Sequence, residues 1–280
     1  MGCIVCATES LRTYMSIDAA WPSEDVKEPD ADQYPLSASA VKKFKRCPMS
    51  FKLRYLDGHD GTKGSSKYAE LGSAVHEAIE RVLLEDTINS LKEQPNQLRE
   101  LMLGEYRQID PDIPDDSFNT GLECLEVAAR YTAMQSVDEF NGVERDFEYA
   151  LARPDIDHGF HGIMDVNTDS EVWDWKTGKN VYEEDEIIQG MIYAMGFMDE
   201  FGHPPDKVRF VYLQKELERV IEPTDENWQK MLDYVRDVVQ AKQSGEFPAD
   251  PDDGKCHFCG FQGFCPDTPN GAGALEWNHI

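Results

Sequence analysis

The sequence predicts an α/β fold in which helices precede a sheet, and two changes of pattern along the chain indicate it. Between about residues 67 and 85, hydrophobic residues recur at helical spacing and define a buried stripe of Leu71, Val75, Ile79 and Val82. From Val143 onward the pattern changes to short strands, which read VERDFEYAL, GFHGIMDV, EVWDWKTG and, after a further helix, KVRFVYLQK. A final amphipathic helix is expected from about Asp225 to Lys242.

We expect one decorated domain over residues 36–280, because a chain of 280 residues can bury one substantial core. Residues 1–35 are expected to be a disordered acidic lead-in, since residues 16–35 are rich in Asp, Glu and Pro without a sustained period. The first helix reads SASAVKKFKRC, with a serine available as its N-cap and Cys47 near its end. Residues from about 86 to 140 are expected to be a helical insertion, and residues 254–266 a cysteine-rich tail.

The chain carries 54 acidic and 27 basic side chains, and the resulting formal charge of -27 opposes binding to nucleic acid in ordinary buffer. A dense carboxylate surface is tolerated in a high-salt cytoplasm, where the Debye length falls to about 3 Å at 1 M salt. An acidic tail is the alternative explanation, but the acidic residues run along nearly the whole chain. The composition therefore favours a halophilic source.

Residues 36–56 are the exception to this acidity, because they contain no acidic side chain. This stretch, called the basic segment below, carries Lys42, Lys43, Lys45, Arg46, Lys52 and Arg54. On so acidic a protein, a basic segment indicates a DNA-binding surface that contacts phosphates. The alternative is a solvated helix face, which is what most charge runs are.

No apolar run approaches the ~18 residues that a membrane span needs, and the N-terminus lacks a secretion signal, so we expect a cytoplasmic protein with no membrane partner. Seven cysteines in such a chain indicate metal-binding or core positions sooner than disulfides. Three of them form a C-x2-C-x5-C array in the tail: Cys256, Cys259 and Cys265. Three thiolates need a further ligand, and the spacing leaves open both an iron-sulfur cluster and zinc, the latter with or without His257.

The segment HGIMDVNTDSEVWDWKTGK predicts a hairpin whose two-residue loop is Asp169-Ser170. This register places Asp165 directly across from Asp174, and opposed carboxylates destabilise a sheet unless a cation lies between them. Strand alternation puts Lys176 on the same face as Asp174. Such oxygen ligands suit Mg2+ or Mn2+, which can activate a water that Lys176 would orient or deprotonate. The alternative is a charged surface hairpin.

Asp165 followed by Asp174-Trp175-Lys176-Thr177-Gly178, with Gly162 in place, resembles the GxxD...DxKTG signature of RecB-like PD-(D/E)XK nucleases. Residues 72–76 resemble the GxxxH motif of that family and residues 189–193 its QxxxY motif, and all three motifs occur in family order. The resemblance covers about residues 36–266. It implies a restriction-endonuclease-like α/β fold, with a mixed central sheet flanked by helices, a helical insertion and a C-terminal iron-sulfur staple.

The resemblance also implies the site residues. The catalytic residues would be Asp165, Asp174, Lys176, His76, Gln189 and Tyr193. The divalent metal would be bound by His76, Asp165, Asp174 and the backbone carbonyl of Trp175. RecB-like nucleases with an iron-sulfur cluster carry one cysteine before the nuclease core and three after it, which implies a 4Fe-4S cluster on Cys47, Cys256, Cys259 and Cys265.

Motif for motif, the chain is similar to CRISPR-associated RecB-like exonucleases and their stand-alone viral relatives, which implies a halophilic archaeon or its virus as the source. Those enzymes act on single-stranded DNA ends, so the resemblance implies an exonuclease that hydrolyses phosphodiester bonds. No G-x4-GK[ST] loop is present, so its strands would come from spontaneous ends or from proteins of CRISPR adaptation, recombination or replication. The alternative is a non-catalytic DNA-binding scaffold with a structural metal cluster, although such a scaffold has no use for opposed carboxylates.

Overall fold

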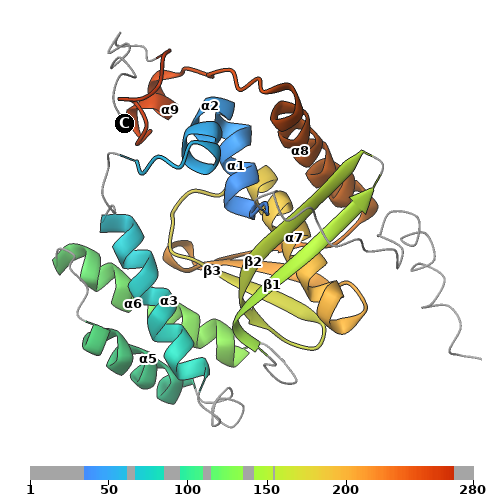
Figure 1. The fold of residues 1–280 in the computed structure, drawn as a ribbon. Helices are drawn as coiled ribbons and strands as arrows, with labels where there is room; N and C mark the ends of the chain where they lie inside the picture. The colour runs from blue at the N-terminus through green and yellow to red at the C-terminus, as the bar shows by residue number, and fades with distance from the viewer. Residues whose placement is uncertain are drawn as a thin grey trace, which may run out of the picture.

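The computed structural model describes residues 35–61, 67–84, 95–109, 115–134, 142–153 and 155–267 (Figure 1). Residues 1–34 of the expected lead-in lie outside the described residues. Two helices of the expected insertion are described, α5 (Pro95–Ile109) and α6 (Asp115–Met134). None of the described helices combines the length and the apolar composition needed to cross a membrane.

A five-stranded mixed sheet forms the centre of the fold, in the order β1-β2-β3-β4-β5. Its first three strands, β1 (Gly142–Arg153), β2 (Ile156–Asn167) and β3 (Glu171–Lys176), form an antiparallel meander. Helix α7 (Glu183–Phe201) then carries the chain back, so that the next strand pairs parallel with β3. That strand is β4 (Lys207–Tyr212), and β5 (Leu217–Ile221) closes the edge antiparallel to it. The mixed sheet confirms the predicted fold class.

Helices cover both faces of the sheet (Figure 1). On one face, α1 (Ala38–Arg46), α7 and α8 (Asp225–Ser244) share a core with Phe210 of β4. On the other face, α3 (Lys67–Leu83), α5 and α6 share a core with both tryptophans of β3. Because side chains alternate along a strand, Asp174 between those tryptophans points to the α7 face.

The first helix of the described chain ends at a cysteine. Ser37 caps α1, since its Oγ accepts a hydrogen bond from the N–H of Ala40 at 3.2 Å. The helix ends at Cys47, and the next residue is a proline that begins α2 (Pro48–Phe51). α2 continues directly into a π-helical turn, η2 (Lys52–Leu56). The segment that was predicted as the first helix is thus confirmed.

The tail of the chain returns to this N-terminal helix. The short helix α9 (Asp253–His257) lies beside α2 in Figure 1. The N–H of Met49 donates to the carbonyl of Pro248 at 3.3 Å, and the side chain of Arg46 donates to the carbonyl of Lys255 at 3.3 Å. Both ends of the described chain are therefore held together, next to Cys47.

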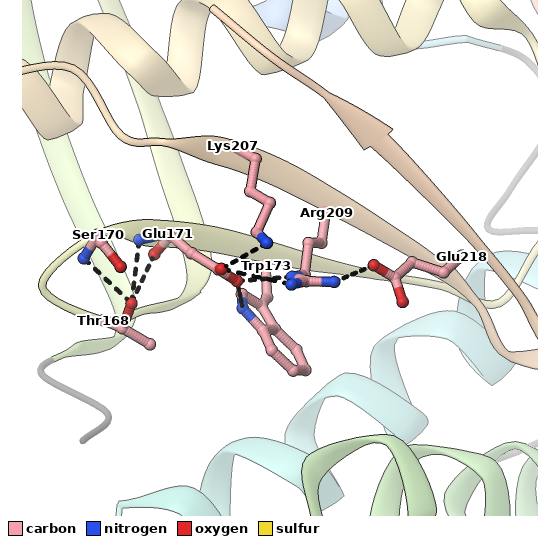
Figure 2. Close-up of polar contacts among 7 residues, drawn as sticks. All are labelled: Thr168, Ser170, Glu171, Trp173, Lys207, Arg209 and Glu218. Atoms are coloured by element: carbon pink, nitrogen blue, oxygen red, sulfur yellow. Dashed lines mark hydrogen bonds and ion pairs between the residues drawn. The ribbon is translucent and has the colours of Figure 1, made fainter. Parts of the chain in front are cut away.

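Polar side chains fix the start of β3 (Figure 2). Thr168 Oγ1 accepts hydrogen bonds from the N–H groups of Ser170 and Glu171, at 3.2 and 3.0 Å, and so closes the turn between β2 and β3. The Glu171 carboxylate is then bound by three donors: Arg209 at 2.5 Å, Lys207 at 2.9 Å and Trp173 Nε1 at 3.2 Å. Glu218 binds the guanidinium of Arg209 from the other side. This network of paired charges pins the beginning of β3 to β4 and β5.

Candidate active site

Asp165 of β2 and Asp174 of β3 face each other where the two strands separate. Val166 pairs with Trp173, and the same register places Asp165 across from Asp174, as the predicted two-residue loop requires. Beyond Val166 the backbone ladder stops, and Asp165 Oδ2 instead accepts the N–H of Trp175 at 2.8 Å. The two aspartates are only 9% and 3% exposed, so two carboxyl groups are buried side by side.

Without a cation this pair is unfavourable. Burial raises the pKa of Asp165 well above its usual range, and the charge of Asp174 raises it further, whereas the Trp175 N–H acts in the opposite direction. Buried carboxylates with few compensating donors are stable in their charged form only when a cation neutralises them. The end of β3 thus has the electrostatics of a cation-binding site.

Helix α7 supplies the side chains that hold Asp174. Gln189 Nε2 donates to Asp174 Oδ2 at 2.7 Å, and the Tyr193 hydroxyl donates to the same oxygen at 2.9 Å. Gln189 and Tyr193 are four positions apart, so both lie on one face of the helix. Lys176 Nζ lies 2.5 Å from Asp174 Oδ1 and donates to Gln189 Oε1 at 3.0 Å. The DxK and QxxxY motifs therefore meet in one hydrogen-bonded network.

Strand β1 adds Glu144, a carboxylate that the sequence reasoning missed. The β1–β2 register runs through the positions on both sides of Glu144 and places it across from Asp165, on the side away from β3. Its φ of 47° lies in the left-handed region, which costs about 1–2 kcal/mol for a residue with a Cβ. Burial, followed by the charge of Asp165, raises the pKa of Glu144 to about 7. Nothing in the sequence separates this glutamate from the other acidic residues of β1, because its position depends on pairing with β2.

His76 of α3 completes the group from the other side of the sheet. His76 Nδ1 lies 3.4 Å from Asp165 Oδ2. One ligand atom from each of His76, Glu144 and Asp165 lies within 4.8 Å of the other two. An imidazole and a carboxylate from two further elements thus converge on the aspartate pair.

Two glycines of the motifs allow the close packing around this site. At Gly72, one turn before His76, a Cβ would lie 3.1 Å from Thr177 Oγ1, so the glycine lets α3 approach the loop that follows β3. At Gly162, three residues before the first aspartate, a Cβ would lie 2.7 Å from the ring of Phe147. These two close approaches explain why both motifs have glycine, a residue without a side chain, at these positions.

The donor set fits a divalent cation. The carboxylates of Glu144 and Asp165 and the imidazole of His76 offer hard oxygen ligands and one nitrogen, a combination that suits Mg2+ or Mn2+, and Asp174 lies across the strand pair from Asp165. Asp174 Oδ1 is buried and, although Lys176 lies close to it, accepts no well-aligned hydrogen bond. A carboxylate oxygen has two lone pairs, so this one could bind a metal ion beside the Lys176 ammonium.

Four cysteines from the two ends of the described chain line a second site. Cys47, Cys256, Cys259 and Cys265 are all free thiols around one cavity of about 90 Å³. Local hydrogen bonds fold the tail around it, since the N–H of Cys259 donates to the carbonyl of Cys256 and the N–H of Cys265 to that of Phe261. Closure of the chain through α1 is what brings Cys47 to the other three.

The basic segment is spread over several environments. Four of its six cations have partners on the protein: Lys45 with Glu184 and Asp185, Lys52 with Asp57, Arg54 with Asp60, and Arg46 with the Lys255 carbonyl. Lys43 lies 5.5 Å from the centre of the Phe261 ring, in the wall of the cysteine pocket. Lys42 turns into the active site and donates to Gln189 Oε1 at 2.9 Å. The six residues therefore do not share one face.

Comparison with known proteins agrees with this architecture. The family model of the PD-(D/E)XK nuclease superfamily matches residues 35–266. No match to a curated protein was found. Among solved structures, one titled "Crystal structure of SSO0001" is 16% identical, and the match covers 70% of this chain and 95% of that chain with a TM-score of 0.35. A TM-score this low has no weight by itself, so the family match stands alone.

Proposed function

Because this chain belongs to the PD-(D/E)XK nuclease superfamily, we propose that it is a metal-dependent DNA exonuclease of the RecB-like type, which hydrolyses phosphodiester bonds at single-stranded ends. The observation that carries the proposal is the buried pair of Asp165 and Asp174, with Lys176 beside it and His76 converging from α3. A scaffold that only binds DNA would gain nothing from these unfavourable charges.

In this proposal the metal is held by His76, Asp165, Asp174 and the backbone carbonyl of Trp175, and Glu144 is a further ligand. When bound, Mg2+ or Mn2+ polarises the phosphodiester and lowers the pKa of an attacking water. Support for Glu144 comes from the distances, because its carboxylate lies within 4.8 Å of ligand atoms of His76 and Asp165. Its raised pKa means that a cation would also relieve a like-charge contact.

The remaining motif residues position the reacting groups. Lys176 lies against Asp174 and would orient or deprotonate the attacking water. Gln189 and Tyr193 hold one oxygen of Asp174 and so fix the orientation of a carboxylate that would bind the metal. The protein thereby fixes its ligands before the substrate arrives, which is how an active site avoids reorganisation during the reaction.

The cysteine pocket is proposed to hold a 4Fe-4S cluster. A tetrahedral zinc ion with bonds of about 2.3 Å would bring its sulfur ligands to about 3.8 Å from one another. Among the described residues, no three of the cysteine sulfurs lie within 4.8 Å of each other, and this wider spacing supports a larger group. Lys43 and Arg46 line the same pocket and would balance the charge of an anionic cluster.

The cluster has a direct test. Anaerobically prepared protein should be brown, with broad absorbance near ~400 nm and roughly four irons per chain, because four thiolates bind a cubane. Replacing Cys47 with serine should lose the iron, since Cys47 is the ligand that comes from the N-terminal side. Stoichiometric zinc without iron would overturn this assignment and leave the nuclease assignment untouched.

DNA would be drawn in by those cations of the basic segment whose partners lie at the surface. Lys52 and Arg54 are paired with single exposed or half-buried carboxylates, which phosphates can displace, because surface ion pairs contribute only about 0–1 kcal/mol. The formal charge of -27 agrees with a halophilic source, where strong screening lets so acidic a protein approach DNA. CRISPR-adaptation, recombination or replication proteins are the proposed suppliers of its strands.

The proposed activity is tested on end-labelled oligonucleotides. We expect Mn2+ or Mg2+ to support loss of nucleotides from single strands, EDTA to stop it, and blunt duplexes to be cut more slowly. Release of internal fragments from a circular single strand would show an endonuclease instead. Binding without cleavage under any divalent metal, by protein that carries its cluster, would favour the non-catalytic DNA-binding scaffold.

A further inference from the structure

Lys42 reaches the centre of the active site from a helix that carries none of the nuclease motifs. It is 147 positions before Gln189, yet its ammonium donates to Gln189 Oε1 at 2.9 Å. Lys176 donates to the same oxygen at 3.0 Å. Two ammonium groups therefore share one neutral acceptor, directly beside Asp174.

The charges around Lys42 are not balanced within the protein. Lys176 has an ion pair with Asp174, whereas Lys42 forms no ion pair with any described residue. Burial, followed by the charge of Lys176, lowers the pKa of Lys42, and Asp174 only partly opposes this. When Asp174 also serves a divalent cation, its charge cannot compensate both lysines. An anion is what this position lacks.

Lys45, on the same helix, is a lysine whose charge is neutralised by ion pairs within the protein. Its ammonium is bound by Glu184 at 2.7 Å and by Asp185 at 2.9 Å, and their hydrogen bonds and charges raise its pKa in spite of partial burial. One turn of α1 thus carries one lysine whose charge is matched by α7 and one whose charge is not.

We propose that Lys42 is a further catalytic residue, which binds a non-bridging oxygen of the scissile phosphate next to Lys176. This inference rests on the proposed function, because the anion it assigns to Lys42 is the phosphodiester of that reaction. A phosphodiester carries one negative charge on two exposed oxygens, so it can accept from both ammonium groups at once. Charge that builds up on those oxygens in the transition state is then stabilised by two preoriented donors.

A purely positioning role is the competing explanation, in which Lys42 only orients the amide of Gln189. The two roles separate in a double-mutant cycle. If Lys42 acts through Gln189, then K42M adds nothing once Gln189 is alanine. If Lys42 binds the phosphate, the rate falls in K42M whether or not Gln189 is present.

The experiment uses full-length protein with its metals, and the variants K42M, K42R, Q189A, K42M/Q189A and the control K230M, which removes an ion-paired lysine of α8. The rate is measured in single turnover on a single-stranded oligonucleotide, and again on bis(p-nitrophenyl) phosphate, a small diester with no DNA backbone beyond the scissile group. Mn2+ affinity by electron paramagnetic resonance and the melting temperature are measured for each variant. K42R tests whether a cation of different shape restores part of the rate.

We expect K42M to lower both rates by about 10²-fold, as removal of one charged donor to a transition state does, with unchanged Mn2+ affinity. K230M should keep the parental rate, and K42M/Q189A should be slower than Q189A. Full activity of K42M, or equal rates for Q189A and K42M/Q189A, would overturn the catalytic role of Lys42. A parent protein that cleaves neither substrate would instead sink the proposed function, which keeps the two failures distinguishable.

Discussion

The half-buried Glu171 at the start of β3 and the buried Asp165 of β2, which lies beside the other end of β3, are in opposite electrostatic states. At its start, burial works to raise the pKa of Glu171, but hydrogen bonds from Arg209 and Lys207 outweigh it and hold the pKa below the usual range (Figure 2). At its other end, burial and Asp174 hold the pKa of Asp165 far above the usual range. Two cations bind the carboxylate of Glu171, whereas Lys176, the ammonium near Asp165, is paired with Asp174 and lowers the pKa of Asp165 too little to offset its burial.

This difference in pKa separates an ion-pair network that stabilises the fold, around Glu171, from a site around Asp165 that needs a bound cation. Glu171 is bound by two cations and an indole N–H, so the fold itself meets its requirements. Asp165 and Glu144 face each other with one backbone N–H and one imidazole nearby. Perturbed carboxyl groups without built-in partners are typical of functional sites, and this contrast is visible only when charges are compared pair by pair.

The largest effect on the cleavage rate is expected at the end of β3 that carries Asp174. D174A should lower cleavage by at least about 10³-fold, because it removes a metal ligand and the partner of Lys176. Its melting temperature without metal should change little, since the loss of a carboxylate that repels Asp165 offsets the loss of the acceptor for Lys176, Gln189 and Tyr193. Cleavage at the parental rate would show that the active site has been placed wrongly.

A change at the start of β3, where Glu171 is paired with cations, should lower stability and leave cleavage intact. E171A should lower the free energy of unfolding by about 2–4 kcal/mol, because it leaves Arg209 and Lys207 without their shared carboxylate. Since folding lowers the pKa of Glu171, its contribution is present above the ordinary value of 4.5 and is lost as pH falls below it. Denaturant titrations at pH 7 and pH 3.5 measure this, and cleavage by the folded variant should remain. Equal stability of E171A and the parent at pH 7 would show that the ion pairs of Glu171 do not stabilise the fold.

A smaller effect of the opposite sign is expected at Glu144. Folding raises its pKa from 4.5 to about 7, so the parent protein loses stability as pH rises through that interval. E144Q should therefore stabilise the metal-free protein at pH 8 by about 1–2 kcal/mol, and the difference should vanish below about pH 4.5. The same variant should bind Mn2+ about tenfold more weakly, which isothermal titration measures. Unchanged Mn2+ affinity would exclude Glu144 from the metal site.

The parts of the site that were predictable are those that short stretches of sequence determine. The two-residue loop sets the register of β2 and β3, and that register alone opposes Asp165 and Asp174. Helical spacing places Gln189 and Tyr193 on one face, and strand alternation places Lys176 with Asp174. Each of these relations needs only a turn or a few residues of regular structure.

The parts that were missed depend on how distant elements are rotated against one another. Glu144 lies in the site because β1 pairs with β2 and because Glu144 itself has a left-handed φ. No local sequence pattern predicts either feature. Lys42 and Lys43 are adjacent in a run of charges, yet one turns to the active site and the other to the cysteine pocket. The run predicts a surface that contacts DNA phosphates, but a charge run cannot show that the packing of α1 between two sites turns Lys42 and Lys43 in different directions.

The closure of α1 onto the tail also sets an order of assembly. Asp174 and Gln189 are 15 positions apart, whereas the hydrogen bond from Arg46 to Lys255 joins residues 209 positions apart. Loop closure is less unfavourable for the shorter separation, so the β3–α7 network can form while α1 is still undocked. During synthesis Cys256, Cys259 and Cys265 are made after the sheet and α7, and Cys47 must wait for these three partners. A nascent chain would thus hold Asp174, Lys176 and Gln189 in place before these three cysteines exist, so the catalytic network can assemble without the cysteine pocket.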